Sequence, residues 1–278
     1  GVADALAEGA GAVHEAAPDN VLVDVTPVSS PGLDDIFTSA AHVVEVGIST
    51  ARITAAPLEG RACVAAFDER TGQVVLQTST QVPHTVRTAV ALSLGMDEHQ
   101  VRVISPDVGG GFGQKCVVAR EEVLAAAVAR LLRRTVTWVE DRREGLTSGF
   151  QAREQFYQVR GAFDATGHLL GLDADIRCDV GAYSCYPVTC GVEVLMAANE
   201  LPGPYRLRIY RARSRGIATN KTPIAPYRGV SRPQAVLAME RLMDEAGRVT
   251  GLGAVEVRDR NLVDAQEFPY RNVMGASY

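Results

Sequence analysis

The stretch Asp107–Lys115 reads DVGGGFGQK and places four glycines within five residues, at positions 109, 110, 111 and 113. It follows the apolar segment VRVIS (101–105), which predicts a buried strand, and it precedes REEVLAAAVARLLRR (120–134), which predicts a helix with acids at its start and arginines at its end. Glycines leave backbone N–H groups open to close approach by a ligand, and the helix that follows adds its positive dipole end. The stretch therefore predicts a strand–loop–helix unit that holds an electron-rich group, with a tight packing turn as the alternative.

Two common phosphate-binding loops do not fit this spacing. A Walker A loop needs G-x-x-x-x-G-K-[ST], but Lys115 is followed by Cys116. A dinucleotide fingerprint that starts from Gly109 and Gly111 needs a third glycine at the position of Gln114. A nucleotide-binding module built around the loop is therefore kept only as an alternative hypothesis.

The segments on both sides of the loop predict an α+β domain. Short β-branched stretches bounded by turn residues predict strands at 42–49, 62–68, 73–79, 135–141, 155–164, 168–183 and 207–215. Apolar residues at helical spacing predict helices at 82–95 and 235–251. We expect a domain over 41–278 with mixed sheets and packed helices, divided into two lobes at approximately 41–150 and 151–278. Residues 1–40, which have weak periodicity, are expected to form a connecting arm.

Composition excludes some classes of function. The chain has 278 residues, 46% hydrophobic, and a net charge of −5 without a long basic cluster, so nucleic acid is not expected as a partner. It has no run of 18 apolar residues to span a membrane and no readable signal peptide. The five scattered cysteines match neither a zinc nor a ferredoxin spacing, which indicates a reducing, cytoplasmic location. Because the chain starts without Met and ends in running sequence, we expect a fragment of a longer protein.

Four segments, in order, resemble the molybdenum hydroxylases, the family of xanthine dehydrogenase, aldehyde oxidase and the carbon monoxide dehydrogenase large subunit. The loop GGGFGQK (109–115) resembles the first cofactor loop of that family. APLEGRACVA (56–65) is similar to its P-M-E-P stretch, STQVPHTVR (79–87) to its S-T-Q segment, and APYRGVSRPQA (225–235) to its A-Y-R-G-x-G-R-P-x-A block. VRDRNLV (257–263) matches its R-x-x-N-L ending. The resemblance covers nearly all of residues 40–278 and is to the first molybdopterin-binding domain.

This resemblance implies a molybdenum-dependent oxidoreductase that hydroxylates a small molecule at an aldehyde or N-heterocycle carbon, with water as the oxygen source. It implies molybdopterin, in the cytosine dinucleotide form, which holds the molybdenum so that no side chain ligates the metal directly. The general base of the family lies in the second molybdopterin-binding domain, so this chain alone would be incomplete and inactive. The resemblance also implies iron–sulfur ([2Fe-2S]) and FAD groups on partner subunits or domains. A non-catalytic relative kept for assembly is the second alternative.

Residue roles follow from the alignment with the family motifs. Gln81 aligns with a glutamine whose amide donates to the oxo ligand, with a backbone-bonded Gln at a strand end as the alternative. Gly110, Gly111, Phe112 and Gly113 form the segment closest to the cofactor, where Gly111, Phe112 and Gly113 offer N–H groups and a buried Phe112 shapes the pocket. Arg228 aligns with an arginine that borders both substrate and cofactor, with a structural salt bridge as the alternative.

Three further positions carry expectations. Glu59 matches a glutamate that touches the substrate in purine oxidisers, although a structural Glu at the strand start is equally compatible. Gly229 stands where the carbon monoxide dehydrogenases have a copper-binding cysteine, which speaks against a copper-linked site, and Ser231 stands where the family often has Gly. Alternate arginines at 206, 208, 211, 213 and 215 are expected on a solvated strand edge, with a subunit or a cofactor phosphate as other partners.

Overall fold

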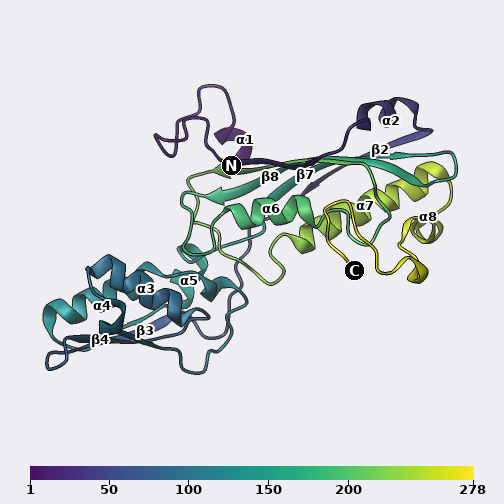
Figure 1. Ribbon diagram of the computed structural model, residues 1–278. Helices are drawn as coiled ribbons and strands as arrows, with labels where there is room; N and C mark the ends of the chain where they lie inside the picture. The colour runs from purple at the N-terminus through teal and green to yellow at the C-terminus, as the bar shows by residue number, and fades with distance from the viewer.

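The computed structural model describes residues 1–278 and shows two lobes side by side (Figure 1). The smaller lobe contains a four-stranded sheet in the order β5 (Val101–Ile104), β4 (Gln73–Thr78), β3 (Ala62–Asp68) and β6 (Val136–Val139). The larger lobe contains a five-stranded sheet in the order β1 (Val21–Ser29), β9 (Tyr210–Ala218), β8 (Leu169–Gly181), β7 (Gln155–Phe163) and β2 (His42–Ser49). Both sheets are mixed, because β4 and β5 run parallel, as do β8 and β9, whereas the other pairs are antiparallel. The α+β, two-lobed prediction is confirmed.

Two helices cover one face of the smaller sheet, α3 (Pro83–Leu94) and α4 (Arg120–Leu132). Helix α3 begins with Pro at its first turn, where no N–H is needed, and it ends at Gly95 in the left-handed conformation. Val90 of α3 and Ala126 of α4 are fully buried against Leu76 of β4 in the core of this lobe. This packing fixes the strand–loop–helix unit that carries the glycine loop.

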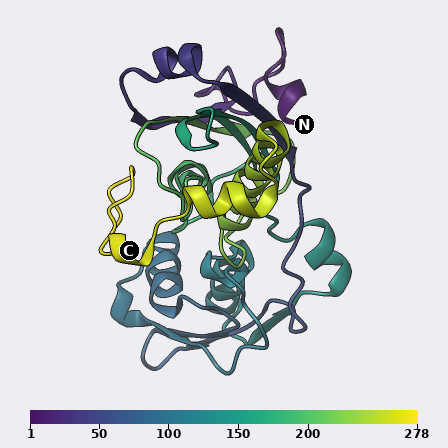
Figure 2. The same ribbon diagram turned by 90° about the vertical axis from the view of Figure 1, so that its right-hand side faces the viewer.

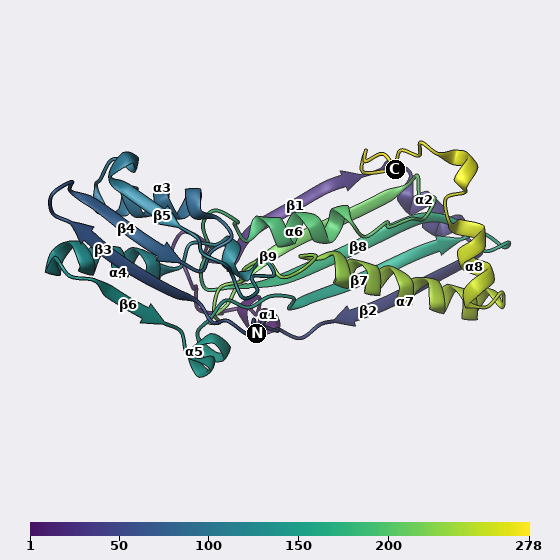
Figure 3. The same cartoon turned by 90° about the horizontal axis from the view of Figure 1, so that it is seen from below.

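Helices α6 (Gly191–Asn199) and α7 (Arg232–Thr250) pack along one face of the larger sheet (Figure 3). Helix α7 buries a stripe at spacings of three and four residues, which faces the sheet: Ala235, Ala238, Met239, Leu242, Met243 and Ala246. Helix α8 (Ala254–Asn261) follows α7 and packs against it. The short helices α1 (Val2–Ala5) and α2 (Leu33–Ser39) lie on the other side of the sheet (Figure 1). The core of this lobe contains 27 buried residues.

The lobes divide the sequence differently from the expectation. Strand β1, within the expected connecting arm of residues 1–40, is an edge strand of the larger sheet and pairs with β9, and its residues Val23 and Val25 pack on the core. Strand β2 was assigned to the first lobe, but it pairs with β7 from His42↔Phe163 to Ser49↔Phe156 and buries Val44 in the larger lobe. The larger lobe therefore takes residues from both sides of the smaller one.

The prediction of a solvated strand edge for the alternate arginines was wrong for β9, which lies between β1 and β8. Its arginines project from the face opposite α6 and α7, where they form ion pairs with aspartates of neighbouring strands. The pairs are Arg211–Asp173 at 2.9 Å, Arg213–Asp24 at 2.6 Å and Arg215–Asp175 at 2.7 Å. These arginines are therefore paired across strands on a partly exposed face of the sheet and do not lie along a free edge.

The remaining elements are α5 (Arg142–Thr147) and the 3-10 helices η1 (Glu98–Gln100), η2 (Gln114–Cys116) and η3 (Ala265–Glu267). None of the helices combines the length and the apolar character needed to cross a lipid bilayer. Helix η2 directly follows the glycine loop, and α5 follows β6 near the junction of the lobes, which Figure 2 shows from the side.

Candidate functional site

The glycine loop lies where the two lobes meet. It connects β5 to η2 in the smaller lobe, and the turn Tyr227–Val230 of the larger lobe contacts it. The backbone N–H of Arg228 donates to the carbonyl of Phe112 at 2.8 Å. A Cβ atom at Gly113 would lie 2.7 Å from the carbonyl oxygen of Pro226, and the φ of Gly113 is +97°, so this position requires glycine. The structure thus brings two sequence motifs, far apart in the chain, into direct contact.

Gln81 lies directly behind the loop, just before α3. Its side-chain Oε1 accepts a hydrogen bond from the N–H of Gly113 at 3.0 Å, and its own backbone N–H donates to the carbonyl of Lys115 at 3.0 Å. A Cβ atom at Gly111 would overlap the Gln81 amide oxygen, so the absence of a side chain there is what admits Gln81. Because Oε1 is occupied, the Nε2 end of the amide is left as a free donor.

Three consecutive N–H groups of the loop donate to no acceptor within the chain, those of Gly110, Gly111 and Phe112. Of the three donors expected at Gly111, Phe112 and Gly113, the last is instead taken by Gln81. Unpaired backbone donors grouped in one short loop are suited to bind electron-rich atoms.

Glu59 lies under the same loop and is held by three donors that converge on its Oε2 atom. The N–H of Gly109 donates to it at 2.7 Å, the hydroxyl of Ser79 at 2.8 Å and the ammonium of Lys115 at 2.8 Å. Partial burial opposes ionisation, but the hydrogen bonds from Lys115, Ser79 and Gly109 outweigh it and lower the pKa of Glu59. These contacts favour the structural alternative for Glu59, since its carboxylate fastens the start of the glycine loop.

Phe112 differs from its expected burial, because 44% of the residue is exposed. Its φ is +54°, in the left-handed region that residues with side chains rarely adopt. Ala56, Arg153 and Val230, which also have positive φ, lie in segments around the junction of the lobes. Such conformations concentrate at functional sites, where the surrounding structure holds them in place.

Arg228 is exposed, and its guanidinium forms neither an ion pair nor a hydrogen bond within the chain. Within this chain Arg228 therefore forms no salt bridge, and its role stays a prediction. Its neighbour Gly229 also has a backbone N–H without an acceptor in the chain. Arg228 thus contacts the loop through its backbone N–H and has an exposed side chain without a partner in the chain.

Two residues of this site were not foreseen as such. Lys115 does not complete a Walker A loop, yet its side chain is 1% exposed and contacts Glu59 and Ser79. A buried Lys whose partner is distant in the sequence leaves no local signal. Arg153, whose guanidinium donates to the Arg228 carbonyl at 2.6 Å, carries no signal in the sequence.

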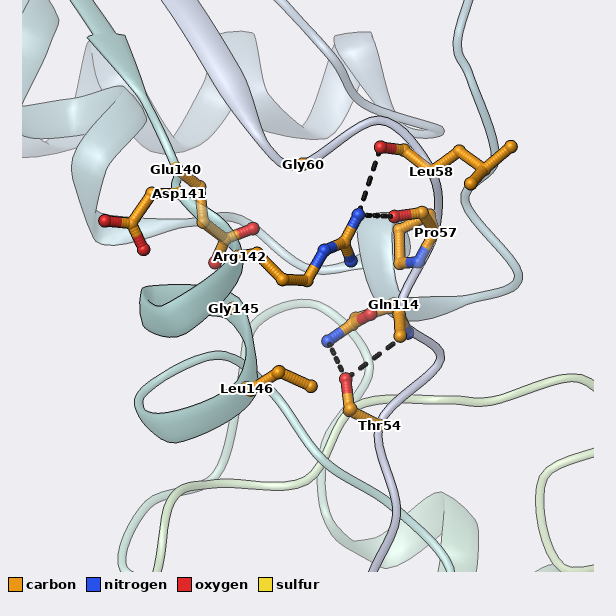
Figure 4. A pocket seen from close by; sticks show the side chains of 11 residues that line it. Thr54, Pro57, Leu58, Gly60, Gln114, Glu140, Asp141, Arg142, Gly145 and Leu146 are labelled. Carbon is orange, nitrogen blue, oxygen red and sulfur yellow. Dashed lines mark hydrogen bonds between the residues drawn. The ribbon is translucent and has the colours of Figure 1, made fainter.

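A pocket of about 200 Å³ adjoins this site on the side of α5 (Figure 4). Arg142 closes it by donating to the carbonyls of Pro57 and Leu58, and Gln114 donates to the hydroxyl of Thr54 at 3.2 Å. None of the residues Glu59, Gln81, Gly110–Gly113 or Arg228 lines it. The pocket is therefore a neighbour of the glycine-loop site and not part of it. All five cysteines are free, and no three His, Cys, Asp or Glu side chains are grouped to hold a metal ion.

Comparisons with known proteins identify the family of the chain. Residues 13–262 match the model of the molybdopterin cofactor-binding domain. The chain is 40% identical over 262 residues to the nicotine 6-hydroxylase large subunit of Paenarthrobacter nicotinovorans, covering 94% of this chain and 32% of that protein. It is 33% identical over 252 residues to the carbon monoxide dehydrogenase large chain of Hydrogenophaga pseudoflava, covering 88% and 31%. The chain thus spans about one third of the length of these relatives.

The crystal structure of quinoline 2-oxidoreductase from Pseudomonas putida 86 is similar with a TM-score of 0.89 and 39% identity, covering 93% of this chain and 33% of that one. These relatives do not favour the alternative of a nucleotide-binding module. The family match, which extends over most of the chain and includes the loop at the junction of the lobes, leads to one assignment. The chain belongs to the family of molybdopterin cofactor-binding domains.

Proposed function

We propose that this chain forms one half of a molybdenum-cofactor site in an oxidoreductase that hydroxylates an aldehyde or an N-heterocycle carbon, with water as the oxygen source. The observation that carries the proposal is the row of unpaired N–H groups at Gly110, Gly111 and Phe112, in a loop whose Phe112 carbonyl accepts from the backbone N–H of Arg228. The similarity to proteins named for nicotine and quinoline supports an N-heterocycle over an aldehyde. Substrate, electron acceptor and activity belong to the longer protein that such a site requires.

The residues present fit the group that the family binds. The glycines let the chain pack closely around the loop, since a Cβ at Gly110 would lie 2.8 Å from the Phe112 ring and one at Gly111 would overlap Gln81, and they leave the free N–H groups without side chains of their own. Its free N–H groups and the Nε2 of Gln81 are neutral donors suited to cofactor oxygens. The family resemblance implies that the pterin holds the metal, and no metal ligand is assigned to the chain. The bound cofactor would supply the two-electron redox chemistry.

The chain's own residues have three tasks in this proposal. The N–H groups of Gly110, Gly111 and Phe112, with Gln81, bind and orient the cofactor. Arg228 stabilises negative charge that develops on the substrate, because its guanidinium is always ionised and is free of an internal partner. Glu59, which is paired with Lys115, fastens the start of the glycine loop by accepting from the N–H of Gly109. Proton transfer from the attacking water is assigned to a residue outside this chain.

The finer parts of the proposal concern the cofactor form and the partners. We propose the cytosine dinucleotide form of molybdopterin, a second molybdopterin-binding domain, and [2Fe-2S] and FAD groups on partner subunits or domains. Several relatives are named as a large chain or a subunit, which supports a multi-subunit complex. A cytoplasmic location is proposed from the five free cysteines.

The test is to express the complete polypeptide with its partners, measure molybdenum by mass spectrometry, and assay N-heterocycles and aldehydes in ¹⁸O-labelled water. We expect molybdenum in the complex and label in the product. Gly111→Ala should displace the Gln81 amide and lower molybdenum content, whereas Gly11→Ala, which meets no atom within 4 Å, should not. A wild-type complex without molybdenum, or one that loads normally in Gly111→Ala, contradicts the proposal.

A further inference from the structure

The contact between the two lobes at the site depends on strained backbone. The Arg228 N–H donates to the Phe112 carbonyl at 2.8 Å, and both Phe112 and Val230 have left-handed φ, at +54° and +56°. Residues with side chains keep such conformations only where surrounding contacts enforce them. Something in the larger lobe must therefore hold the turn Tyr227–Val230 against the glycine loop.

Arg153, just before β7, makes the contacts that do this. Its Nη2 donates to the carbonyl of Arg228 at 2.6 Å and to that of Tyr227 at 3.3 Å, and its guanidinium lies 4.4 Å from the centre of the Tyr227 ring. Arg153 forms no salt bridge. A cation directed at backbone carbonyls and an aromatic face contributes binding to this turn.

A buried polar cluster fixes the far end of the same turn. The hydroxyl of Ser231 lies 2.6 Å from Oε2 of Glu193, and Nε2 of Gln155 donates to both side chains at 2.7 Å. All three residues are buried, and burial raises the pKa of Glu193 against the effect of Ser231, Arg153 and Gln155. Gln155 lies two residues after Arg153, so the start of β7 contacts the turn at both ends. Ser231, which stands where the family often has Gly, thus takes part in this support.

We infer that Arg153 is a positioning residue, which holds the turn Tyr227–Val230 so that the Arg228 side chain and the glycine loop keep a fixed relation to each other. Arg153 acts through Arg228 and is not assigned a contact with substrate or cofactor. The support of the turn is independent of the reaction, whereas the effect on turnover rests on the function proposed above.

Hydrogen exchange of the complete complex tests the support directly. Arg153→Met should raise the exchange rates of peptides that cover residues 108–116 and 226–232 by about tenfold, since the turn loses a charge-assisted hydrogen bond. Arg160→Met is the matched control, because Arg160 likewise lies over an aromatic ring, that of Phe37, but within β7 and away from the turn. Unchanged exchange in these two peptides, or an equal increase throughout the larger lobe, overturns the inference.

Kinetics separate positioning from a general structural role. In the complex, Arg153→Met should lower kcat/KM by about tenfold when Arg228 is present and have no further effect in the Arg228→Ala background. Arg153→Lys keeps one donor for the Arg228 carbonyl, so its kcat/KM should lie between that of wild type and that of Arg153→Met. Additive losses overturn the inference. A complex without molybdenum refutes the proposed function instead, and the exchange experiment still decides whether Arg153 supports the turn.

Discussion

The ammonium nitrogen of Lys115 lies 2.8 Å from Oε2 of Glu59, but the two side chains differ in exposure, at 1% for Lys115 and 35% for Glu59. A charge that loses its partner in the interior cannot be rehydrated, whereas one near the surface can. The two residues of this pair are therefore not equivalent, although each is needed to fasten the glycine loop.

We expect Glu59→Gln to lower the free energy of unfolding by about 3 kcal/mol and Lys115→Met by about 1 kcal/mol. The first substitution leaves a buried ammonium without its counter-charge. The second leaves a half-exposed carboxylate that still accepts from Ser79 and Gly109. Urea unfolding of the two variants measures the difference, and a larger loss for Lys115→Met contradicts it.

The lowered pKa of Glu59 predicts a dependence of stability on pH. The folded state favours the ionised carboxylate, so the contribution is complete above the ordinary value of 4.5 and is lost as the pH falls through the folded pKa. The stability difference between wild type and Glu59→Gln should therefore stay constant from pH 7 to about 4.5 and shrink as the pH is lowered further through the folded pKa. Unfolding free energies measured along this series test it, and a difference that stays constant argues against an ionised Glu59.

Glu193 supplies a control of opposite sign. Burial is the largest influence on this carboxyl and raises its pKa above 4.5. The protonated form is thus favoured in the folded state, and its contribution is present below the ordinary pKa and is lost as the pH rises through the folded one. The difference in unfolding free energy between wild type and Glu193→Gln should therefore fall as the pH rises. For Glu59→Gln the corresponding difference falls as the pH is lowered.

The parts of this site that sequence could predict are those encoded in local patterns. The glycine loop, Gln81 and Arg228 stand in short motifs, and the structure brings them together. The pair of Glu59 and Lys115 could not be predicted, because a fully buried Lys is rare and its partner is distant in sequence. The contacts of Arg153 depend on how the lobes meet, for which no local signal exists.

The fold likewise contains elements that local patterns predict and elements that depend on pairing with distant segments. Strands β3, β4 and β5 and helices α3 and α4 follow from periodicity, because each packs against neighbours close in the chain. Strand β1 was missed since Pro27 interrupts it and its pairing with β9 has a bulge between Val25 and Val28. Proline in a strand is typical of a sheet edge, and β1 lies at that edge. Strand β2 was recognised, but its partner β7 lies beyond the whole smaller lobe.

Phe112→Gly should change the free energy of unfolding by less than about 1 kcal/mol. The loss of packing is limited because 44% of the residue is exposed, and glycine relieves the left-handed φ of +54°. Phe163→Ala, at a fully buried position of β7, is the comparison and should cost about 3–5 kcal/mol. Chemical unfolding of both variants provides the measurement. A loss of several kcal/mol for Phe112→Gly would show that the ring carries packing energy.

Removal of the charge from two aspartates of the larger sheet should lower the free energy of unfolding by different amounts. Asp179 has a fully buried side chain and pairs with Arg52 at 2.7 Å and Lys221 at 2.9 Å, so Asp179→Asn should cost about 3 kcal/mol. Asp24 pairs with Arg213 at 2.6 Å, but both side chains are exposed by 40% or more, so Asp24→Asn should cost less than about 1 kcal/mol. Thermal unfolding compares the two, and equal losses contradict the argument from burial.

Arg228→Ala should leave folding intact and remove function. The guanidinium has no partner within the chain and is exposed, so its loss should alter the free energy of unfolding by less than about 0.5 kcal/mol. In the complete complex, kcat/KM should fall by about 100-fold if the cation stabilises charge on the substrate in the transition state. Arg241→Ala is the control, an exposed arginine on α7 that pairs only with Asp244 of the same helix. Steady-state kinetics and molybdenum content are measured together, because a variant that loses molybdenum would assign Arg228 to cofactor binding. An unchanged kcat/KM at full molybdenum content would remove Arg228 from the substrate pocket.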